Sequence, residues 1–250
     1  MRLDQALVSM AFAESRSRAQ SMIKNGLVSV NSKTVLKPSF SVCETDKIEC
    51  KEDSLCPYVS RGGIKLKGAI DAFGVDVNGK VCLDIGASSG GFTDCLLKSG
   101  ASKVYCVDSG HSQLHHSLAS DKRVINFENV NARYLDNEII PQLVDIAVMD
   151  VSFISQTKLY EALTKLMKDG GMFISLIKPQ FEVGRSGVGK GGIVKDEKKR
   201  NEAVNNVIEI AKYFGFINQG FITSPIKGGD GNVEFLALFQ YRKALKGETN

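Results

Sequence analysis

The architecture of this chain is best read from one glycine-rich segment, Asp84-Ile85-Gly86-Ala87-Ser88-Ser89-Gly90-Gly91-Phe92-Thr93, which joins a predicted strand at 81–85 to a predicted helix starting near Gly91. Glycines at such a junction let the backbone approach a ligand closely and start the helix beside it. The spacing is G-x-x-x-G-G, whereas a dinucleotide-binding turn reads G-x-G-x-x-G, so a pyrophosphate cradle is not indicated. Asp84, before the first glycine, favours instead an amino acid or sulfonium moiety as the ligand.

Outward from this segment, predicted strands and helices alternate from about residue 64 onward. The apolar strand runs lie at 81–85, 103–107, 124–127, 145–149 and 172–177. Such alternation indicates a parallel sheet covered by helices on both faces. Two more strand runs, at 216–223 and 233–241, are joined by a short link, which favours antiparallel pairing. We therefore predict an α/β fold in which a doubly wound, Rossmann-like sheet is closed by an antiparallel last strand.

Asp108 closes the second predicted strand, where a carboxylate is expected to accept hydrogen bonds from ribose hydroxyls. Together with the glycine-rich segment, this feature resembles the S-adenosylmethionine site of class I methyltransferases. Tight packing of helix on strand without a ligand is the alternative for the glycines. The cofactor contacts that the resemblance implies are Asp84, Gly86, Ala87, Ser88, Gly90, Gly91, Phe92, Asp108, Asn131 and Asp150.

Four polar residues mark the predicted catalytic end: Lys65, Asp150, Lys178 and Glu234. Ligands of open α/β sheets bind beyond the carboxyl ends of the strands, so Asp150 and Lys178, which end the fourth and fifth strands, should meet there. An antiparallel last strand would bring Glu234 to the same edge. The four residues resemble the tetrad of FtsJ-type ribose 2′-O-methyltransferases, which implies a catalytic role for each. Lys178 would then either stabilise a developing alkoxide or accept the hydroxyl proton. The alternative is four unrelated ion-pairing residues.

The first 55 residues form a separate predicted unit of two short helices and a small sheet. Residues 1–42 hold six basic side chains against two acidic ones. The pattern Arg2-Leu3-Asp4-x-x-Leu7, followed by the segment from Ser15 to Asn31, resembles the RNA-binding domain named after ribosomal protein S4. A solvated basic helix face is the alternative. The residues expected to contact RNA, including three outside this unit, are Arg2, Arg16, Arg18, Lys24, Arg61, Arg185 and Lys190.

Residues 56–63 form a predicted connector, so the expected organisation is an α+β RNA-binding domain at 1–55 and a methyltransferase domain at 64–250. The whole chain resembles the TlyA family, whose members methylate the 2′-hydroxyl of cytidine in ribosomal RNA and are also named haemolysins. The resemblance implies S-adenosylmethionine as cofactor, ribosomal RNA or a ribosomal subunit as partner, and large-subunit RNA as substrate. The alternatives are a membrane-active haemolysin and a catalytically silent ribosome-associated RNA-binding factor. The sequence leaves the modified nucleotide and the oligomeric state open.

Composition excludes several other classes of protein. With 43% hydrophobic and 24% charged residues the chain reads as an ordinary globular protein. No run approaches the ~18 apolar residues of a membrane helix, and no signal peptide is evident, so we expect a cytoplasmic protein without stable membrane association. Six scattered cysteines and the clustered His111, His115 and His116 do not predict a metal site. The segment from Gly184 to Lys190 resembles a phosphate loop, but Gly191 stands where Ser or Thr should bind magnesium.

Overall fold

The structure is a computed structural model that divides into two compact units, Met1–Pro57 and Tyr58–Asn250. It describes residues 1–10, 12–13, 16–24, 26–43, 45–50, 56–184, 187–228 and 231–243, with Ser17, Arg18, Ser21 and Lys190 described by their backbone only.

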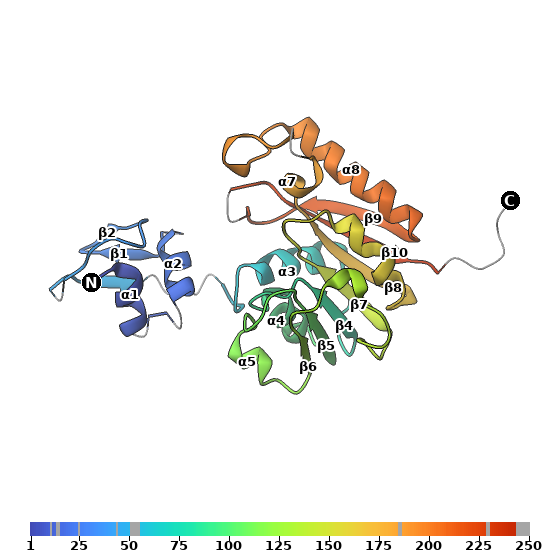
Figure 1. The fold of residues 1–250 in the computed structure, drawn as a ribbon, viewed down its shortest axis with the longest axis horizontal. Helices are drawn as coiled ribbons and strands as arrows, with labels where there is room; N and C mark the ends of the chain where they lie inside the picture. The colour runs from blue at the N-terminus through green and yellow to red at the C-terminus, as the bar shows by residue number, and fades with distance from the viewer. Residues whose placement is uncertain are drawn as a thin grey trace. The chain divides into compact units, whose positions relative to one another are not determined.

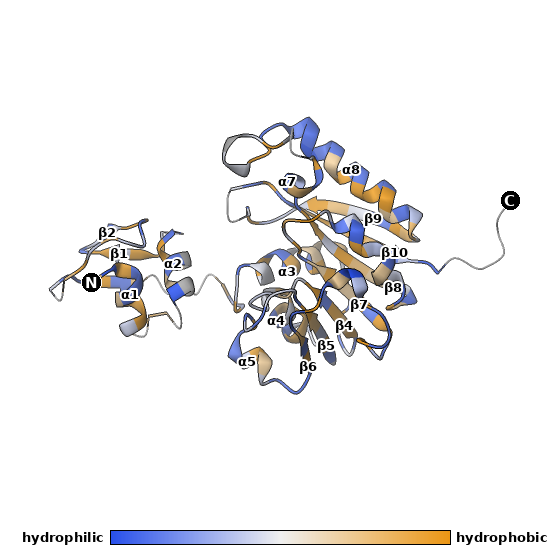
Figure 2. Cartoon of the chain, viewed as in Figure 1, coloured by the Kyte–Doolittle hydropathy of each residue, from blue (hydrophilic) through white to orange (hydrophobic). Residues whose placement is uncertain are grey.

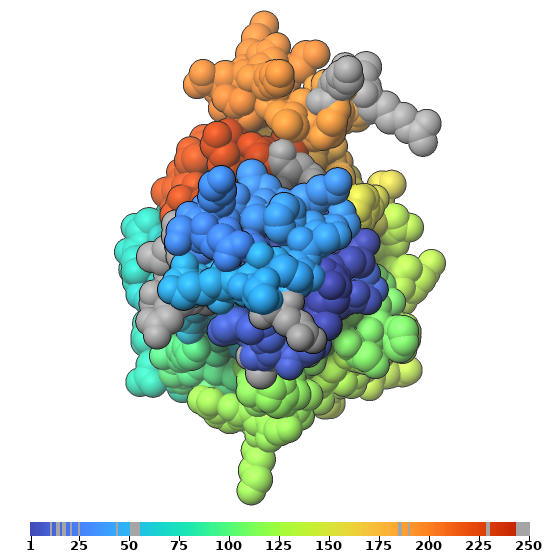
Figure 3. All heavy atoms as spheres, turned by 90° about the vertical axis from the view of Figure 1, so that its left-hand side faces the viewer, coloured from blue at the N-terminus to red at the C-terminus, as the bar shows by residue number. Residues whose placement is uncertain are grey.

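The first unit packs two helices against a three-stranded antiparallel sheet of order β2-β1-β3 (Figure 1). Its elements are α1 (Leu3–Ser9), α2 (Arg16–Lys24), β1 (Val28–Val30), β2 (Lys33–Thr34) and β3 (Ile48–Cys50). Leu3, Ala6 and Leu7 recur at helical spacing and are buried against Ile23 of α2. In the space-filling view the side chains of this unit form one closely packed body (Figure 3).

The second unit is a seven-stranded sheet of order β6-β5-β4-β7-β8-β10-β9, with helices on both faces (Figure 1). Five neighbouring strands are parallel, and β10 runs antiparallel to both β8 and β9. The strands are β4 (Val81–Ile85), β5 (Lys103–Val107), β6 (Val124–Phe127), β7 (Val144–Met149), β8 (Met167–Ile177), β9 (Phe216–Thr223) and β10 (Phe235–Tyr241). The helices are α3 (Gly62–Phe73), α4 (Gly91–Lys98), α5 (His116–Ala119), α6 (Tyr160–Thr164), α7 (Pro179–Glu182) and α8 (Glu197–Tyr213), with 3-10 turns η1 (Ala132–Tyr134), η2 (Gln156–Leu159) and η4 (Lys190–Gly192). The predicted α/β fold with an antiparallel last strand is confirmed.

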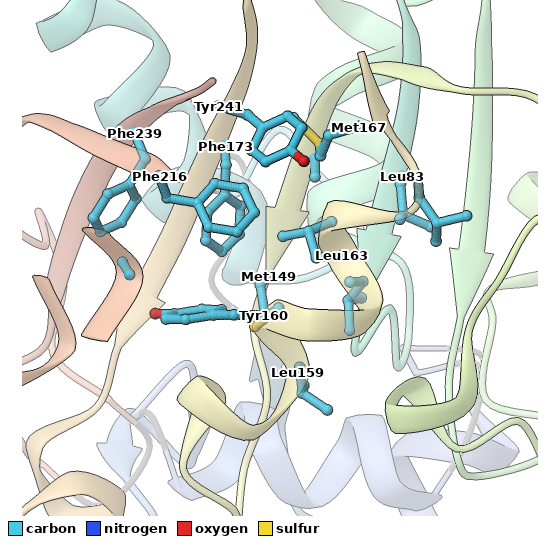
Figure 4. Packing of buried hydrophobic residues seen from close by; sticks show 14 of the residues in the cluster. Leu83, Met149, Leu159, Tyr160, Leu163, Met167, Phe173, Phe216, Phe239 and Tyr241 are labelled. Carbon is cyan, nitrogen blue, oxygen red and sulfur yellow. The ribbon is translucent and has the colours of Figure 1, made fainter. Parts of the chain in front are cut away.

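Two apolar cores lie on opposite faces of this sheet. One combines side chains of α3 and α4 with the sheet, and the other combines those of α6 and α8 with it. The second core is rich in aromatic rings: Tyr160, Phe173, Phe216 and Phe239 pack with ring centroids 5.3 to 5.9 Å apart (Figure 4). The strands of the sheet are mainly apolar, whereas α8 carries a polar stripe along the side away from the sheet (Figure 2). The two cores hold the strand ends that carry the polar residues in fixed positions.

The helix α3 begins earlier than the sequence indicates, at Gly62, inside the predicted connector. Two successive glycines are poor helix formers, but at Gly63 a side chain has no room. A Cβ atom on Gly63 would lie 2.2 Å from the Tyr58 ring, and one on Gly62 would lie 3.4 Å from the Phe92 ring. Tyr58 is therefore packed onto the start of α3, and its close contact explains Gly63, whereas a Cβ on Gly62 would make an ordinary contact.

Candidate active site

Lys178 and Asp150 meet at the carboxyl edge of the sheet. Asp150 directly follows β7, and Lys178 follows β8 and precedes the Pro179 that starts α7. The Lys178 Nζ lies 2.5 Å from Asp150 Oδ1 and donates a hydrogen bond of 2.8 Å to Ser152 Oγ. The two charged side chains are only 12% and 23% exposed. This pair has the position that the parallel strands predict for it.

Lys65 and Glu234 form a second, more deeply buried ion pair. The Lys65 Nζ lies 2.5 Å from Glu234 Oε2, and the two side chains are 11% and 3% exposed. Glu234 reaches the site because β10 runs antiparallel to β8: Phe235 pairs with Ile177, so Glu234 and Lys178 are the next residues along the two strands. The four predicted residues therefore form two ion pairs, and the second is supplied jointly by α3 and the start of β10.

The glycine-rich segment lies directly beside Asp150. The amide of Asp150 donates to the Ile85 carbonyl, and Gly86 has a φ of 85°, in the left-handed region. A Cβ atom on Gly86 would lie 2.4 Å from the Asp150 carbonyl oxygen. Gly90, with a φ of 91°, starts α4 in the same left-handed conformation. Only glycine fits the close approach at Gly86, which brings the glycine-rich turn 84–93, the candidate ligand turn, against the end of β7 at Asp150.

Asp84 is a buried carboxylate that is suited to pairing with a cation. Its side chain is fully buried, and Oδ2 accepts a hydrogen bond of 2.7 Å from Thr93 Oγ1. No described residue donates to Oδ1. Burial raises the pKa of Asp84 to about 7, and the Thr93 hydrogen bond only partly opposes this rise. A buried acceptor without a donor suits a bound ammonium or sulfonium group.

Asp108 holds the other side of this ligand turn. Its two oxygens accept backbone hydrogen bonds, one from Ser88 at 2.8 Å and one from Gly110 at 2.7 Å. Each carboxylate oxygen can accept a further bond. Asp108 therefore fixes the two loops that follow β4 and β5, and it still has acceptor capacity for hydroxyl groups of a ligand.

Two family models match the chain: "FtsJ-like methyltransferase" over residues 58–241 and "S4 domain" over residues 1–48. The first of them covers more than half of the sequence and includes both ion pairs and the ligand turn. The chain belongs to the FtsJ-like methyltransferase family.

Relatives of this methyltransferase are similar along almost its whole length. Hemolysin A of Brachyspira hyodysenteriae is 45% identical over 240 residues, which make up 96% of this chain and 99% of that protein. The 16S/23S rRNA (cytidine-2'-O)-methyltransferase TlyA of Mycobacterium tuberculosis is 42% identical over 234 residues, covering 94% and 87%. A solved Streptococcus thermophilus structure, described as a hemolysin, is 38% identical with a TM-score of 0.78 over 98% of this chain and 89% of that one. Within the described ranges, no helix of this chain is long and apolar enough to cross a membrane.

Several predicted cofactor residues differ in how exposed their side chains are. Ala87 and Phe92 are 6% and 3% exposed and pack in the core with α3 and α4. Ser88 is exposed, with a φ of 47°. Asn131 is exposed, and its Oδ1 accepts a hydrogen bond from the Arg133 amide at the start of η1. Phe92 thus packs in the core, and Asn131 caps the start of η1. Their contacts with a cofactor stay a prediction.

Two of the predicted RNA-contacting residues make intramolecular contacts around Asp4. Arg2 donates to both oxygens of Asp4 at 2.9 Å, Arg16 donates at 3.1 Å and Gln20 at 2.9 Å. The Asp4 side chain is fully buried, and these donors hold its pKa well below the usual range. Arg2 and Arg16 therefore stabilise the unit that is expected to bind RNA, whatever they contribute to binding.

The other residues expected to contact RNA stay predictions, and the structure places them as follows. Lys24 is exposed in the last turn of α2. Arg61 donates to the Lys227 carbonyl at 2.9 Å, which connects α3 to the loop before β10. Arg185 and the side chains of Arg18 and Lys190 lie outside the described part of the chain.

Sequence reasoning missed Phe153, which stands out in the structure. Its side chain is 92% exposed, its φ is 65°, and its ring centroid lies 5.3 Å from that of Phe181. A positive φ is unfavourable for a bulky residue, so the surrounding contacts must enforce it. Neighbouring Ser152 contacts Lys178, so Phe153 follows directly on a residue that touches the Lys178–Asp150 pair. A sequence pattern gives no signal for either feature, because both depend on the tertiary contacts of this loop.

Proposed function

We propose that this methyltransferase transfers a methyl group from S-adenosylmethionine to the 2′-hydroxyl of a cytidine ribose in ribosomal RNA, and that large-subunit RNA in the cytoplasm is its substrate. The observation that carries the proposal is the pair of ion pairs, Lys178–Asp150 and Lys65–Glu234, at the edge of the sheet that also holds the ligand turn. The names of the Mycobacterium tuberculosis relative and of the family support the substrate class.

The residues at the ligand turn fit S-adenosylmethionine. Asp84 offers a buried acceptor oxygen without a described donor, which matches the cationic end of this cofactor, and Asp108 offers acceptors for its ribose hydroxyls. The bound cofactor would supply the methyl group as part of a sulfonium. Gly86 keeps this turn close to Asp150, so the same edge of the sheet serves both binding and chemistry.

Lys178 is the residue assigned to act on the reacting ribose hydroxyl. Methyl transfer forms a bond from the ribose oxygen to the methyl carbon, breaks the sulfur–carbon bond, and releases the hydroxyl proton. A lysine at the oxygen can stabilise the developing negative charge or take that proton. Asp150 and Ser152 hold the Nζ in place, and the buried Lys65–Glu234 pair adds a second fixed charge pair beside it. Holding the oxygen in line with the methyl group supplies much of the rate.

The proposal is tested with purified 50S and 30S subunits from a strain that lacks the modification. We expect wild-type protein to convert one cytidine of the 50S subunit to 2′-O-methylcytidine, detected by nucleoside mass spectrometry. Lys178→Ala should lose this activity while its cofactor affinity, measured by calorimetry, stays within about threefold because Lys178 faces the hydroxyl and not the donor. Lys168→Ala is the matched control, since Lys168 also pairs with an aspartate, Asp145 at 2.6 Å, but at the other end of β8.

Absence of 2′-O-methylcytidine on both subunits with cofactor-loaded wild-type protein would refute the proposed reaction. Modification of the 30S subunit alone would refute the choice of large-subunit RNA. Equal loss of activity in Lys178→Ala and Lys168→Ala would show that Lys178 has no special role.

A further inference from the structure

Glu182, four residues after Lys178, carries a hydrogen-bonded carboxylate that the proposed chemistry does not use. Glu182 is the last residue of α7, and its side chain is half-buried. Its Oε2 accepts a hydrogen bond of 2.7 Å from Ser155 Oγ, and its Oε1 accepts one of 3.1 Å from the Gln156 amide. No described cation forms an ion pair with it. Burial raises the pKa of Glu182, and the hydrogen bonds from Ser155 and Gln156 oppose that rise.

Glu182 joins the same two segments that the catalytic pair joins. At one end, Lys178 contacts Asp150 and Ser152; at the other end, Glu182 contacts the 155–156 dipeptide. Segments 150–156 and 178–182 are thus connected twice. The rings of Phe153 and Phe181 meet between the two connections. Two connections fix both the distance and the relative rotation of the segments, whereas the Lys178–Asp150 contact alone would let them turn about it.

The anchor of this second connection is itself rigid. The Gln156 side chain is 1% exposed, and its Oε1 accepts hydrogen bonds from Tyr160 OH at 3.1 Å and from Ser175 Oγ. Ser175 is fully buried in β8, three residues before Lys178, and it pairs across the sheet with Met149, the residue before Asp150. The hydrogen bonds of the Gln156 side chain to the core of the sheet therefore also hold its main-chain amide, the donor to Glu182, in place.

We infer that Glu182 is a positioning residue for methyl transfer: its carboxylate ties α7 to the 155–156 dipeptide and so sets where the Lys178 amine stands relative to Asp150. The inference rests on the proposed function. Stability alone gives little reason for this residue, because removing a carboxylate from water without a partner cation among the described residues costs free energy that an apolar side chain would not. The carboxylate accepts from one hydroxyl and one main-chain amide; the Ser155 hydroxyl also contacts Thr157 Oγ1 at 2.8 Å, so the main-chain amide of Gln156 is the donor that an apolar side chain would deprive of this acceptor.

The test compares Glu182→Ala with Glu182→Gln in steady-state methylation of the RNA substrate. Displacement of a catalytic group by about 1 Å can cost about 100-fold in rate, so we expect Glu182→Ala to lower kcat by roughly 10- to 100-fold. The KM for RNA and the Kd for the cofactor should stay within about threefold, because Glu182 is not assigned to either ligand. Glu182→Gln should keep kcat within about threefold, since its carbonyl can accept from the Gln156 amide and its amide can donate to Ser155 Oγ.

Asp145→Ala is the matched control for stability. Asp145 accepts from the Val81 amide at 2.9 Å and from Lys168 at 2.6 Å, so it also joins separate segments through one backbone and one side-chain donor. It lies near the start of β7, at the end of the sheet away from Asp150. We expect its melting temperature to fall while kcat is unchanged.

The outcomes separate the inference from the proposed function. Inactive wild-type protein refutes the function. Active wild-type protein together with unchanged kcat in Glu182→Ala, or a loss in Glu182→Gln as large as in Glu182→Ala, refutes the positioning role. A kcat loss in Asp145→Ala equal to that in Glu182→Ala also refutes it, because stability would then explain both. If Glu182→Ala does not fold, Ser155→Ala takes its place, and an unchanged kcat in that variant refutes the inference.

Discussion

Protonation of Asp84 is expected to make cofactor affinity depend on pH. The side chain is fully buried, and burial raises its pKa to about 7, so near neutral pH the free protein holds a mixture of the ionised and protonated carboxyl. The unpartnered Oδ1 is the atom that a cationic ligand would use. A cation pairs with the ionised carboxylate, so ligand binding below pH 7 must first remove a proton from Asp84.

The size of this effect follows from the pKa. One pH unit below the pKa costs about 1.36 kcal/mol of binding free energy, which is a tenfold rise in Kd. Between pH 7.5 and 5.5 the Kd for S-adenosylmethionine should therefore rise by about 25-fold, most of it below pH 7. The α-amino group of the ligand has an ordinary pKa of about 7.7 to 8.0, so it remains mostly protonated through this interval and adds little slope.

Isothermal titration calorimetry in two buffers of different ionisation enthalpy measures both the Kd and the protons released. We expect close to one proton released per bound cofactor at pH 5.5 and fewer than half at pH 7.5. Asp84→Asn should bind more weakly at pH 7.5 and show no pH dependence from 5.5 to 7.5. Asp108→Asn is the matched control, because it removes a carboxylate from the same turn and should keep the pH slope. A wild-type Kd that does not change with pH, or an unchanged slope in Asp84→Asn, would show that Asp84 does not control cofactor affinity in this pH range.

Three further predictions concern two basic residues of the first unit and the exposed ring of Phe153. Lys24→Ala should weaken RNA binding and lower the log–log salt slope by about 0.7 to 0.9 if it removes one phosphate contact, without changing the melting temperature; an unchanged slope in filter binding would assign Lys24 to a solvated face. Arg16→Ala should instead lower the melting temperature, measured by circular dichroism, because the buried Asp4 carboxylate loses one of its donors, and an unchanged melting temperature would contradict that role. Phe153→Ala should raise the KM for RNA by roughly 5- to 150-fold, as expected for loss of about 1 to 3 kcal/mol of base stacking, while Phe153→Tyr keeps it and the cofactor Kd does not change. If the KM for RNA stays the same in Phe153→Ala, the exposed ring does not contact the substrate.

The sheet could be predicted well from the sequence because its parallel strands are buried on both faces and read as apolar runs. The strand β8 shows where this signal ends. Apolar residues predict a strand at 172–177, but the observed strand runs from Met167, across Gly170 with a φ of 77°. The polar and glycine residues at 168–171 read as a loop, yet the register of β7 with β8 shifts across this stretch and the pairing continues to Met167. Backbone pairing across such an irregularity leaves no mark in the hydrophobic pattern.

The candidate site was predictable to the extent that strand ends define it. Asp150 and Lys178 follow parallel neighbours, so the topology alone brings them together. Lys65 lies on a helix, and only the family resemblance indicated that it belongs to the set. Which lysine pairs with which carboxylate depends on side-chain directions, and so does the second connection through Glu182. These contacts could not be read from spacing, because each joins segments that are distant from one another in the sequence.

The charges at the two ends of the site favour binding of a sulfonium over binding of the neutral thioether product. Lys178 and Lys65 are each paired with a carboxylate of their own, so the edge of the sheet where these two ion pairs lie is close to neutral. The ligand turn, by contrast, carries Asp84 and Asp108, a local excess of negative charge that attracts a sulfonium. In the proposed reaction the sulfonium loses its positive charge when the methyl group leaves. The product therefore lacks the electrostatic attraction between that charge and the acidic residues of this turn. If the sulfonium is the group that pairs with Asp84, the product leaves this carboxyl without a cation, and burial again favours its protonated form. The Kd of the product should then depend on pH less steeply than that of the cofactor, whereas pairing with the ammonium group, which the product retains, would give the two ligands the same slope.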